Sequence, residues 1–329
     1  MGLIYKTCFA FIIAFAVSAL LLKIFIPILR KAKLGQKILE IGPSWHKCKE
    51  GTPTMGGLFF MIGIFAAAGI FLLPHDIKNG DYSLLIHMLF ALSYGIVGFV
   101  DDYVKLFKKQ NKGLTPMQKL AIQTVFTVAY LVLLVKFEYV DTTLRIPFFG
   151  SLDLGFFYYP VCTLAIMYLV NCANLTDGID GLAGSVAAVI FLFFSLLTYK
   201  LFLTSHESLF VLSIACLGAM LAFLVFNFHP AKVFMGDTGS QFLGAMIVAM
   251  CFAVNAGVWS VVICFIYLIE GISVILQVMS YKLTGKRIFK MAPIHHHFEK
   301  SGWSEVKIVF VFSTVTALFS ALTYFLFTL

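Results

Sequence analysis

The chain has 329 residues, of which 60% are hydrophobic and only 12% are charged, and its mean hydropathy is +0.96. Soluble domains carry about 25% charged residues, so this composition excludes an ordinary soluble protein and predicts an integral membrane protein. The formal net charge of +8 does not indicate nucleic-acid binding, because the Lys and Arg residues cluster in a few loops between long apolar runs.

These apolar runs predict ten membrane-spanning helices. A spanning helix needs about 20 mostly apolar residues, and continuous rather than alternating runs favour helices over barrel strands. We therefore expect one all-α transmembrane domain over residues 1–329, a bundle of about ten helices whose first span is retained. The expected spans are residues 3–29, 53–73, 82–100, 117–136, 156–173, 181–203, 208–226, 239–256, 259–281 and 305–327.

The distribution of Lys and Arg predicts the orientation. Even-numbered loops hold few cations, whereas most lie in odd-numbered loops, which we therefore expect to face the cytoplasm, with both termini on the outer side. The unusual polar clusters of the chain also fall in odd-numbered loops, so we expect the chemistry on the cytoplasmic face. These loops span about residues 30–52, 101–117, 173–181, 227–239 and 282–304.

The first two clusters combine charge with glycine. Lys49 precedes the glycine-rich segment 51–57 and suits a phosphate ligand, although loop lysines also attract anionic lipid. Asp101 and Asp102 end a long apolar run, and two adjacent carboxylates at a membrane edge are unfavourable without a cation or a proton. They predict a metal site or a proton-handling site; the alternative is that two acids simply begin a polar loop. Lys119 is a cation beyond the same loop.

The next two clusters lie before later spans. Asn174, Asp177 and Asp180 stand among glycines and could contact a base or sugar, although a helix cap and an Asx-turn would also explain the two acids. Asp237 lies in the segment Gly236–Ser240, where free N–H groups at a helix start attract phosphate, and it could instead bind a metal or merely cap the helix. Phe234, near Asn227, could stack on an aromatic ligand, but alone it would be interpreted as packing.

The last cluster is the run His295, His296 and His297. Consecutive residues of a regular element cannot all face one metal, so we expect one or two of them to bind phosphate or shuttle protons; otherwise the run is a polar surface loop. Glu270 is the acid placed in the middle of a span, where a charge usually faces a cavity or a partner. Its role is left unassigned.

Five motifs together resemble the phospho-N-acetylmuramoyl-pentapeptide-transferase (translocase I) family of the polyprenyl-phosphate N-acetylhexosamine-1-phosphate transferase superfamily. The likeness extends from about residue 46 to residue 300, and the order of the motifs matches. The motifs are GTPTMGG (51–57), FVDDY (99–103), NCANLTDGIDG (171–181), VFMGDTGSQ (233–241) and PIHHHFE (293–299).

The resemblance implies transfer of phospho-MurNAc-pentapeptide from UDP-MurNAc-pentapeptide to undecaprenyl phosphate, with release of UMP and formation of lipid I for peptidoglycan. It also implies Mg²⁺, ten transmembrane helices, a homodimer, and a bacterial plasma (inner) membrane with the active site facing the cytoplasm. Asp237 resembles the metal ligand, with Asp101 or Asp102 near it. The implied catalytic residues are Asp101, Asp102, Asp237, Lys49, Lys119 and His295–His297. The implied substrate contacts are Asn174, Asp177, Asp180, Asn227 and Phe234.

Three questions stay open at this stage. The residues do not decide which of Asp101 and Asp102 is the base, and direct in-line attack by the lipid phosphate is preferred over a two-step route through an aspartyl intermediate. A sister enzyme that transfers GlcNAc-1-phosphate is the alternative function, although the uninterrupted histidine run favours the muramoyl substrate. A secondary transporter is disfavoured because its ionisable residues would lie near the bilayer midplane.

Overall fold

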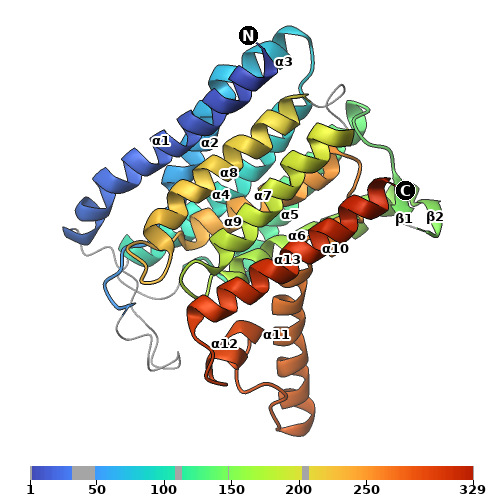
Figure 1. Ribbon diagram of the computed structural model, residues 1–329. Coiled ribbons are helices and arrows are strands. Elements are labelled where there is room, and N and C mark those ends of the chain that lie inside the picture. The colour runs from blue at the N-terminus through green and yellow to red at the C-terminus, as the bar shows by residue number, and fades with distance from the viewer. Residues whose placement is uncertain (1, 32–48, 108–112, 147, 202–206, 329) are drawn as a thin grey trace.

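The computed structural model describes residues 2–31, 49–107, 113–146, 148–201 and 207–328 (Figure 1). Parts of the first two predicted cytoplasmic loops, residues 32–48 and 108–112, lie outside the described residues. The helices of the first half are α1 (Leu3–Lys31), α2 (Gly57–Phe71), α3 (Leu73–Lys78), α4 (Ser83–Phe107), α5 (Pro116–Lys136) and α6 (Tyr158–Thr176). The helices of the second half are α7 (Leu182–Leu201), α8 (Glu207–Asn227), α9 (Gly236–Ala253), α10 (Ser260–Ile263), α11 (Phe265–Thr284), α12 (Ile294–Glu299) and α13 (Glu305–Thr328).

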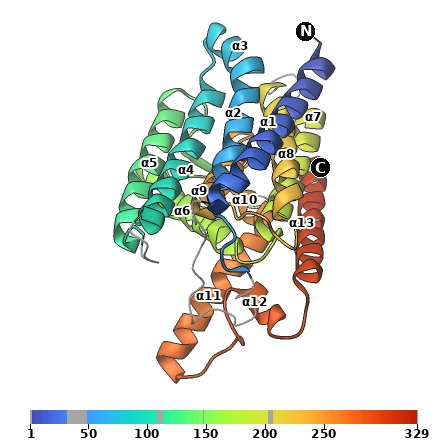
Figure 2. The same cartoon turned by 90° about the vertical axis from the view of Figure 1, so that its left-hand side faces the viewer.

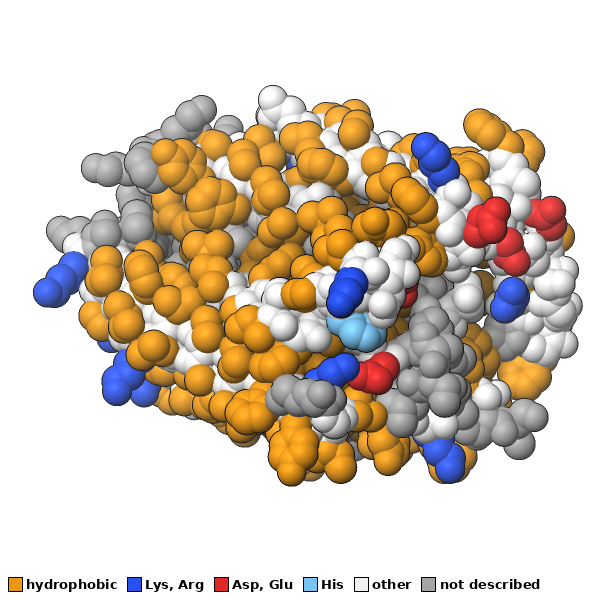
Figure 3. Space-filling model, turned by 90° about the horizontal axis from the view of Figure 1, so that it is seen from above, with side chains coloured by type: hydrophobic (Ala, Val, Ile, Leu, Met, Phe, Trp, Pro, Cys, Tyr) orange, Lys and Arg blue, Asp and Glu red, His pale blue; other side chains and the backbone are white. Residues whose placement is uncertain are grey.

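The prediction of an all-α integral membrane protein is confirmed. Each of the ten predicted spans falls on a helix, and within the described residues eight helices are long and apolar enough to cross a membrane. The other two are α2, with 15 residues, and α9, with 18 residues. Hydrophobic side chains cover most of the face shown in Figure 3, with charged groups confined to small patches, as expected for a surface in contact with lipid.

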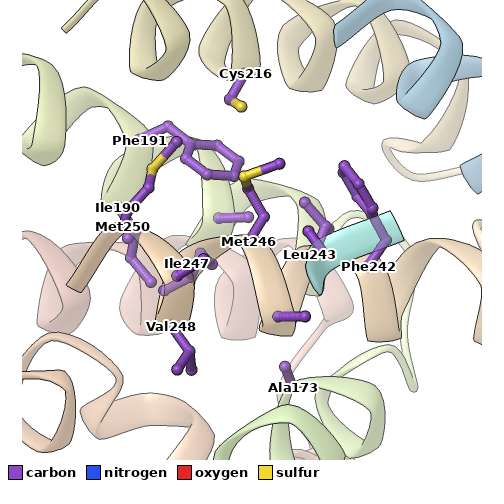
Figure 4. Packing of buried hydrophobic residues seen from close by; sticks show 14 of the residues in the cluster. Ala173, Ile190, Phe191, Cys216, Phe242, Leu243, Met246, Ile247, Val248 and Met250 are labelled. Atoms are coloured by element: carbon purple, nitrogen blue, oxygen red, sulfur yellow. The ribbon is translucent and has the colours of Figure 1, made fainter. Parts of the chain in front are cut away.

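Helix α9 is the central element of the bundle. Every residue from Thr238 to Phe252 is buried, and α9 packs against α2, α4, α6 and α7. A helix that is hydrophobic all round belongs in the core rather than on a lipid-facing surface. Figure 4 shows Phe242, Met246 and Met250 of α9 surrounded by side chains of neighbouring helices. The first turn of α9 is thereby fixed at one end of the bundle.

Some predicted boundaries were wrong in a way that affects the site. Helix α4 continues to Phe107, so Asp101 and Asp102 lie within its last two turns and do not begin a loop. Helix α9 begins at Gly236, so Asp237 belongs to its first turn. An apolar run marks where a span contacts lipid, so it stops at the first polar residue. The helix can continue past that residue when the polar side chains are buried against other helices.

The predicted even-numbered loop between α5 and α6 contains a hairpin that the sequence analysis missed. Strands β1 (Thr143–Ile146) and β2 (Gly150–Asp153) pair antiparallel, with Thr143 opposite Asp153 and Ile146 opposite Gly150. Four-residue strands give little alternation to detect. The ninth predicted span is also divided, into the short α10 and the longer α11.

Helices α11 and α12 extend beyond the other helices at one end of the bundle (Figure 2). Both chain termini lie at the end away from α12 (Figure 1), which agrees with an even number of spans. Their placement on the outer side of the membrane stays a prediction.

Two glycines of α2 offer a matched test of the packing. A Cβ added at Gly63 would lie 2.1 Å from Ser18 Oγ of α1, whereas one added at Gly69 would meet nothing within 4 Å. Gly63→Ala should lower the apparent melting temperature in detergent, since overpacking costs about 1–3 kcal/mol. Gly69→Ala should leave it unchanged or raise it, because Ala is favoured over Gly in helices by about 1 kcal/mol. Equal melting temperatures for the two variants would contradict the close contact of α1 and α2.

Candidate active site

Three carboxylates from two helices converge at the end of the bundle that carries α12. Asp101 and Asp102 come from the last turns of α4 and Asp237 from the first turn of α9, and one oxygen of each lies within 4.8 Å of the others. Gly98 permits this approach, because a Cβ there would lie 2.1 Å from the carbonyl oxygen of Asp237. The structure thus brings together the three acids that the sequence predicted as a metal site.

Asp102 holds the N-terminus of α9. Its Oδ1 accepts a hydrogen bond from the N–H of Asp237 (3.2 Å), and its Oδ2 accepts from the N–H and Oγ1 of Thr238 (2.9 and 2.7 Å). A helix start leaves N–H groups without partners and favours a negative charge. Gly236 is needed beside this carboxylate, because it has a φ of +71° and a Cβ there would lie 2.6 Å from Asp102 Oδ2. Asp102 therefore caps α9 from a different helix.

Two lysines bind the other two acids. Lys105 Nζ lies 2.6 Å from Asp101 Oδ2 and 3.0 Å from Asp237 Oδ2, and Lys119 Nζ lies 3.1 Å from the same Asp237 oxygen. The remaining oxygen of Asp101 accepts a hydrogen bond from the N–H of Leu114 (2.7 Å). Lys119 was predicted as a site residue. Lys105 was not, although its position one helical turn after Asp101 could have indicated it.

The turn after α6 borders the carboxylate cluster. Asn174 Nδ2 donates to Asp237 Oδ1 (2.9 Å) and to Ser240 Oγ (2.7 Å). Burial raises the pKa of Asp177 well above its usual value, and the neighbouring carboxylates of Asp237 and Asp102 raise it further. Burial and the neighbouring negative charges thus favour the protonated form of Asp177.

Lys49 and Asp180 belong to a second cluster next to this turn. Lys49 Nζ lies 2.7 Å from Asp180 Oδ1 and 2.6 Å from Glu305 Oε2, and His229 Nδ1 lies 3.1 Å from Asp180 Oδ2. Burial lowers the pKa of Lys49, but the bonds to Asp180 and Glu305 outweigh this, so the net shift is upward. Sequence reasoning missed Glu305 and His229, which become neighbours of Asp180 only through the fold. The ammonium group of Lys49 is used here to join three segments of the chain.

Asn227, the last residue of α8, and Phe234, in the loop after it, are the two predicted nucleoside contacts here, and they differ in how far their side chains are already engaged. Asn227 is buried, and its Oδ1 accepts from the N–H of Gly181 (3.1 Å) while its Nδ2 donates to the carbonyl oxygen of Val233 (2.9 Å). Both ends of the amide are therefore used to join two loops. Phe234 is half-buried, and its backbone binds the glycine-rich segment through Pro53 and Gly56.

The three histidines lie on the short helix α12 rather than in a loop, and their ring contacts differ. His295 is fully buried, and its Nδ1 lies 3.0 Å from Oε2 of the equally buried Glu270. His296 pairs with Glu299, while His297 Nδ1 accepts a hydrogen bond from the N–H of Lys290 (3.1 Å). Glu270, whose role the sequence left unassigned, therefore pairs with His295 in the structure.

The three converging acids have the donor chemistry of a magnesium site. Carboxylate oxygens are the ligands that Mg²⁺ takes in proteins, and the acids are close enough to share one cation. The two lysines already place positive charge at this point. Within the described part of the chain, Asp180, His229 and Glu305 form the second group with suitable spacing, but Lys49 supplies the cation there.

Comparison with known proteins agrees with this geometry. The model of glycosyl transferase family 4 matches residues 84–255, and a phospho-N-acetylmuramoyl-pentapeptide-transferase signature matches residues 49–61. The chain is 44% identical to the phospho-N-acetylmuramoyl-pentapeptide-transferase of Clostridium perfringens (strain SM101 / Type A) over 95% of this chain and 94% of the relative. The chain belongs to the phospho-N-acetylmuramoyl-pentapeptide-transferase family.

Further relatives in this transferase family show similar coverage. The transferase of Clostridium botulinum (strain Eklund 17B / Type B) is 44% identical over 93% of this chain and 92% of its own length. The transferase of Halalkalibacterium halodurans (strain ATCC BAA-125) is 42% identical over 96% and 95% of the two chains. The family predicted from five motifs is thus confirmed over nearly the whole chain.

The hydrogen bonds predict that Asp102 contributes more to stability than Asp101. Asp102→Asn removes or weakens three charge-assisted hydrogen bonds, each worth about 1.5–3 kcal/mol, and we expect this loss to outweigh the relief of repulsion between Asp102 and Asp237. Asp101→Asn loses one such backbone bond and the contact with the half-exposed Lys105. Thermal melting of the purified variants should show a larger decrease for Asp102→Asn. A decrease that is equal or larger for Asp101→Asn would refute the capping role.

Proposed function

We propose that this membrane transferase moves phospho-MurNAc-pentapeptide from UDP-MurNAc-pentapeptide to undecaprenyl phosphate, giving UMP and lipid I for peptidoglycan synthesis. The names of the relatives support this reaction. The observation that carries the proposal is the convergence of three carboxylates and two lysines at one end of a transmembrane bundle. Such a site suits phosphoryl transfer between a water-soluble donor and a lipid acceptor.

We propose that Asp237 binds Mg²⁺, assisted by Asp101. Asp237 keeps about 20% of its side chain exposed, compared with 5% for Asp101, so it is the more accessible ligand. When bound, the metal ion would supply positive charge to the phosphate oxygens. Lys105 and Lys119 contact the same Asp237 oxygen and are free to exchange this contact for phosphate.

The transfer itself is proposed as one direct step. An oxygen of the lipid phosphate forms a bond to the β-phosphorus of the donor, and the bond from that phosphorus to the bridging oxygen breaks, so UMP leaves with the electron pair. Lys105 and Lys119 would stabilise the negative charge in this transition state. A covalent aspartyl intermediate is less well supported, because the carboxylate oxygens of Asp102 accept hydrogen bonds from α9, and those of Asp101 contact the N–H of Leu114 and Lys105.

The division of labour between the two adjacent acids follows from their partners. Asp102 is bound by three donors of α9, so a proton on it would disrupt the cap. Asp101 has one backbone donor and one exchangeable lysine. We assign Asp101 as the residue able to accept a proton and Asp102 as the residue that positions the start of α9.

The nucleoside end of the donor is proposed to bind along the turn from Asn174 to Asp180 and against Phe234. Asn227 would shape this pocket through its bonds to Gly181 and Val233 without contacting the base. Lys49 would hold the turn through Asp180 instead of binding phosphate directly. His295 packs on the same turn, because a Cβ at Gly178 would lie 2.2 Å from its Nε2, which leaves His296 and His297 as candidate phosphate contacts.

We further propose that this end of the bundle faces the cytoplasm of a bacterial cell, where UDP-linked sugars are made. The concentration of Lys and Arg in the odd-numbered loops supports that side. The homodimer implied by the resemblance stays a prediction.

The metal assignment predicts that Asp237→Asn abolishes transfer while the protein remains folded. Losing several kcal/mol of electrostatic stabilisation corresponds to a decrease of about 1,000-fold or more in UMP release. Asp153→Asn, at an exposed position of β2, is the matched control and should retain full activity. Near-normal release of UMP by Asp237→Asn in the presence of Mg²⁺ would refute the ligand role.

A binding measurement separates the metal site from catalysis. Titration with Mn²⁺, followed by electron paramagnetic resonance, should show one tight site in the parent and a much weaker one in Asp237→Asn. Unchanged Mn²⁺ affinity would place the metal ion elsewhere.

The choice of donor is tested separately. UMP release from UDP-MurNAc-pentapeptide should exceed release from UDP-GlcNAc by at least about 100-fold, because a site built to bind polar substrate groups discriminates strongly. Undecaprenyl phosphate is the acceptor in both assays. Turnover of UDP-GlcNAc alone would establish the alternative GlcNAc-1-phosphate transferase.

A further inference from the structure

An aromatic surface lies at the end of the bundle opposite the carboxylate site. Phe148 and Phe149 follow β1 at the hairpin turn, and Phe156 and Phe157 precede α6; their exposure ranges from 69% to 87%. We call these four residues the phenylalanine patch. In Figure 1 the hairpin lies at the right-hand edge of the molecule, far from α12. Four exposed rings so close in sequence are unfavourable in water.

The backbone holds one of these rings in a conformation that Phe rarely adopts. Phe148 has a φ of +66°, in the left-handed region that favours Gly or Asn, and a bulky residue there is a genuine outlier. Strained residues of this kind gather where the side chain serves a purpose. The outward position of Phe148 is thus maintained against both hydration and backbone preference.

The phenylalanine patch continues the lipid-facing surface of two membrane-spanning helices. The hairpin joins the end of α5 to the start of α6, and exposed apolar side chains of those helices lie at this same end: Phe137 on one side, Val161 and Leu164 on the other. Large exposed apolar patches mark surfaces that contact a membrane or another protein. Because the patch adjoins the exposed apolar surface of two spanning helices, we expect lipid to cover it as well.

A cavity lies behind the hairpin. Its volume is about 170 Å³, enough for part of an acyl chain, and it opens between β1, the start of α6 and the segment after α9. The deeper lining is mostly apolar and includes Ile166, Leu169 and Phe252. Two charged residues on the lining, Arg145 and Asp141, are more than half exposed and have Nη2 and Oδ2 3.5 Å apart, so they lie at the mouth.

We propose that the hairpin and this cavity bind one phospholipid whose head group carries both a phosphate and an ammonium, such as phosphatidylethanolamine. Part of an acyl chain fills the apolar cavity, and the phenylalanine patch packs on the neighbouring lipids. Arg145 binds the phosphate and Asp141 the ammonium, so the pair at the mouth matches a zwitterionic head group better than an anionic one. The proposal is independent of the transferase activity, because it involves none of the residues of the carboxylate site.

Filling the cavity tests the proposal directly. Native mass spectrometry of the parent protein, released from vesicles of equal parts phosphatidylethanolamine and phosphatidylglycerol, should show one retained phosphatidylethanolamine. Ala165→Trp should lose it, because Ala165 lines the cavity and is exposed enough to accept a larger side chain. Leu164→Trp is the matched control, since the adjacent Leu164 is exposed and does not line the cavity, and it should retain the lipid.

The assignment of the zwitterionic head group is tested by a second variant and by the choice of lipid. Arg145→Ala should reduce retention of phosphatidylethanolamine at least several-fold. Equal retention of the two lipids by the parent would overturn the zwitterionic assignment. Retention of lipid by Ala165→Trp at the level of Leu164→Trp would overturn the cavity as the binding site.

The phenylalanine patch is tested by photo-crosslinking in native membranes. A benzoylphenylalanine placed at Phe148 should form adducts with phospholipid on irradiation. Crosslinks to a second copy of the chain would show that a protein interface covers the patch, and an absence of both products would show that it faces water; either result overturns the proposal. Unchanged UMP release by the same protein would verify that the bundle is folded.

Discussion

The site depends on how one carboxylate is used to fix the start of a buried helix. Asp102 accepts three hydrogen bonds from the first turn of α9, in a place where unpaired N–H groups would be costly. This contact sets the distance between α4 and α9, and it therefore sets the position of Asp237 relative to Asp101. The arrangement of the three acids therefore depends on a structural contact, the capping of α9 by Asp102.

Glycine makes that interaction geometrically possible. At Gly98 and Gly236 a Cβ would come within 2.1 and 2.6 Å of atoms belonging to the carboxylate site. The end of α4 and the start of α9, which both carry carboxylates, can then approach closely, and Lys105 and Lys119 compensate the charge. The lysines also explain how a three-acid cluster is stable in the buried end of an apolar bundle, where uncompensated charge would be expensive.

Other polar contacts at this end of the bundle join segments that are distant in sequence. Lys49 links the glycine-rich segment to Asp180 and to Glu305 at the start of α13, while Glu270 links α11 to His295 of α12. Lys49, Asp180, Glu305 and Glu270 each have a partner of opposite charge or a hydrogen-bonding partner, as burial requires. The opposite end contains the hairpin and the phenylalanine patch.

The sequence by itself determined the membrane class, the approximate positions of ten helices, the family and most of the acids of the site, because composition, apolar run length and motif order are local properties. It did not determine that Asp101 and Asp102 lie inside α4 or that Lys105 forms an ion pair with Asp237. It also did not determine that the side-chain amide of Asn227 hydrogen-bonds to two backbone groups. It also did not show which partner each of the three histidines has, or that Glu305 belongs with Lys49. Only the tertiary structure decided these points, because each depends on the distance between side chains from helices far apart in the chain, and packing around α9 sets those distances.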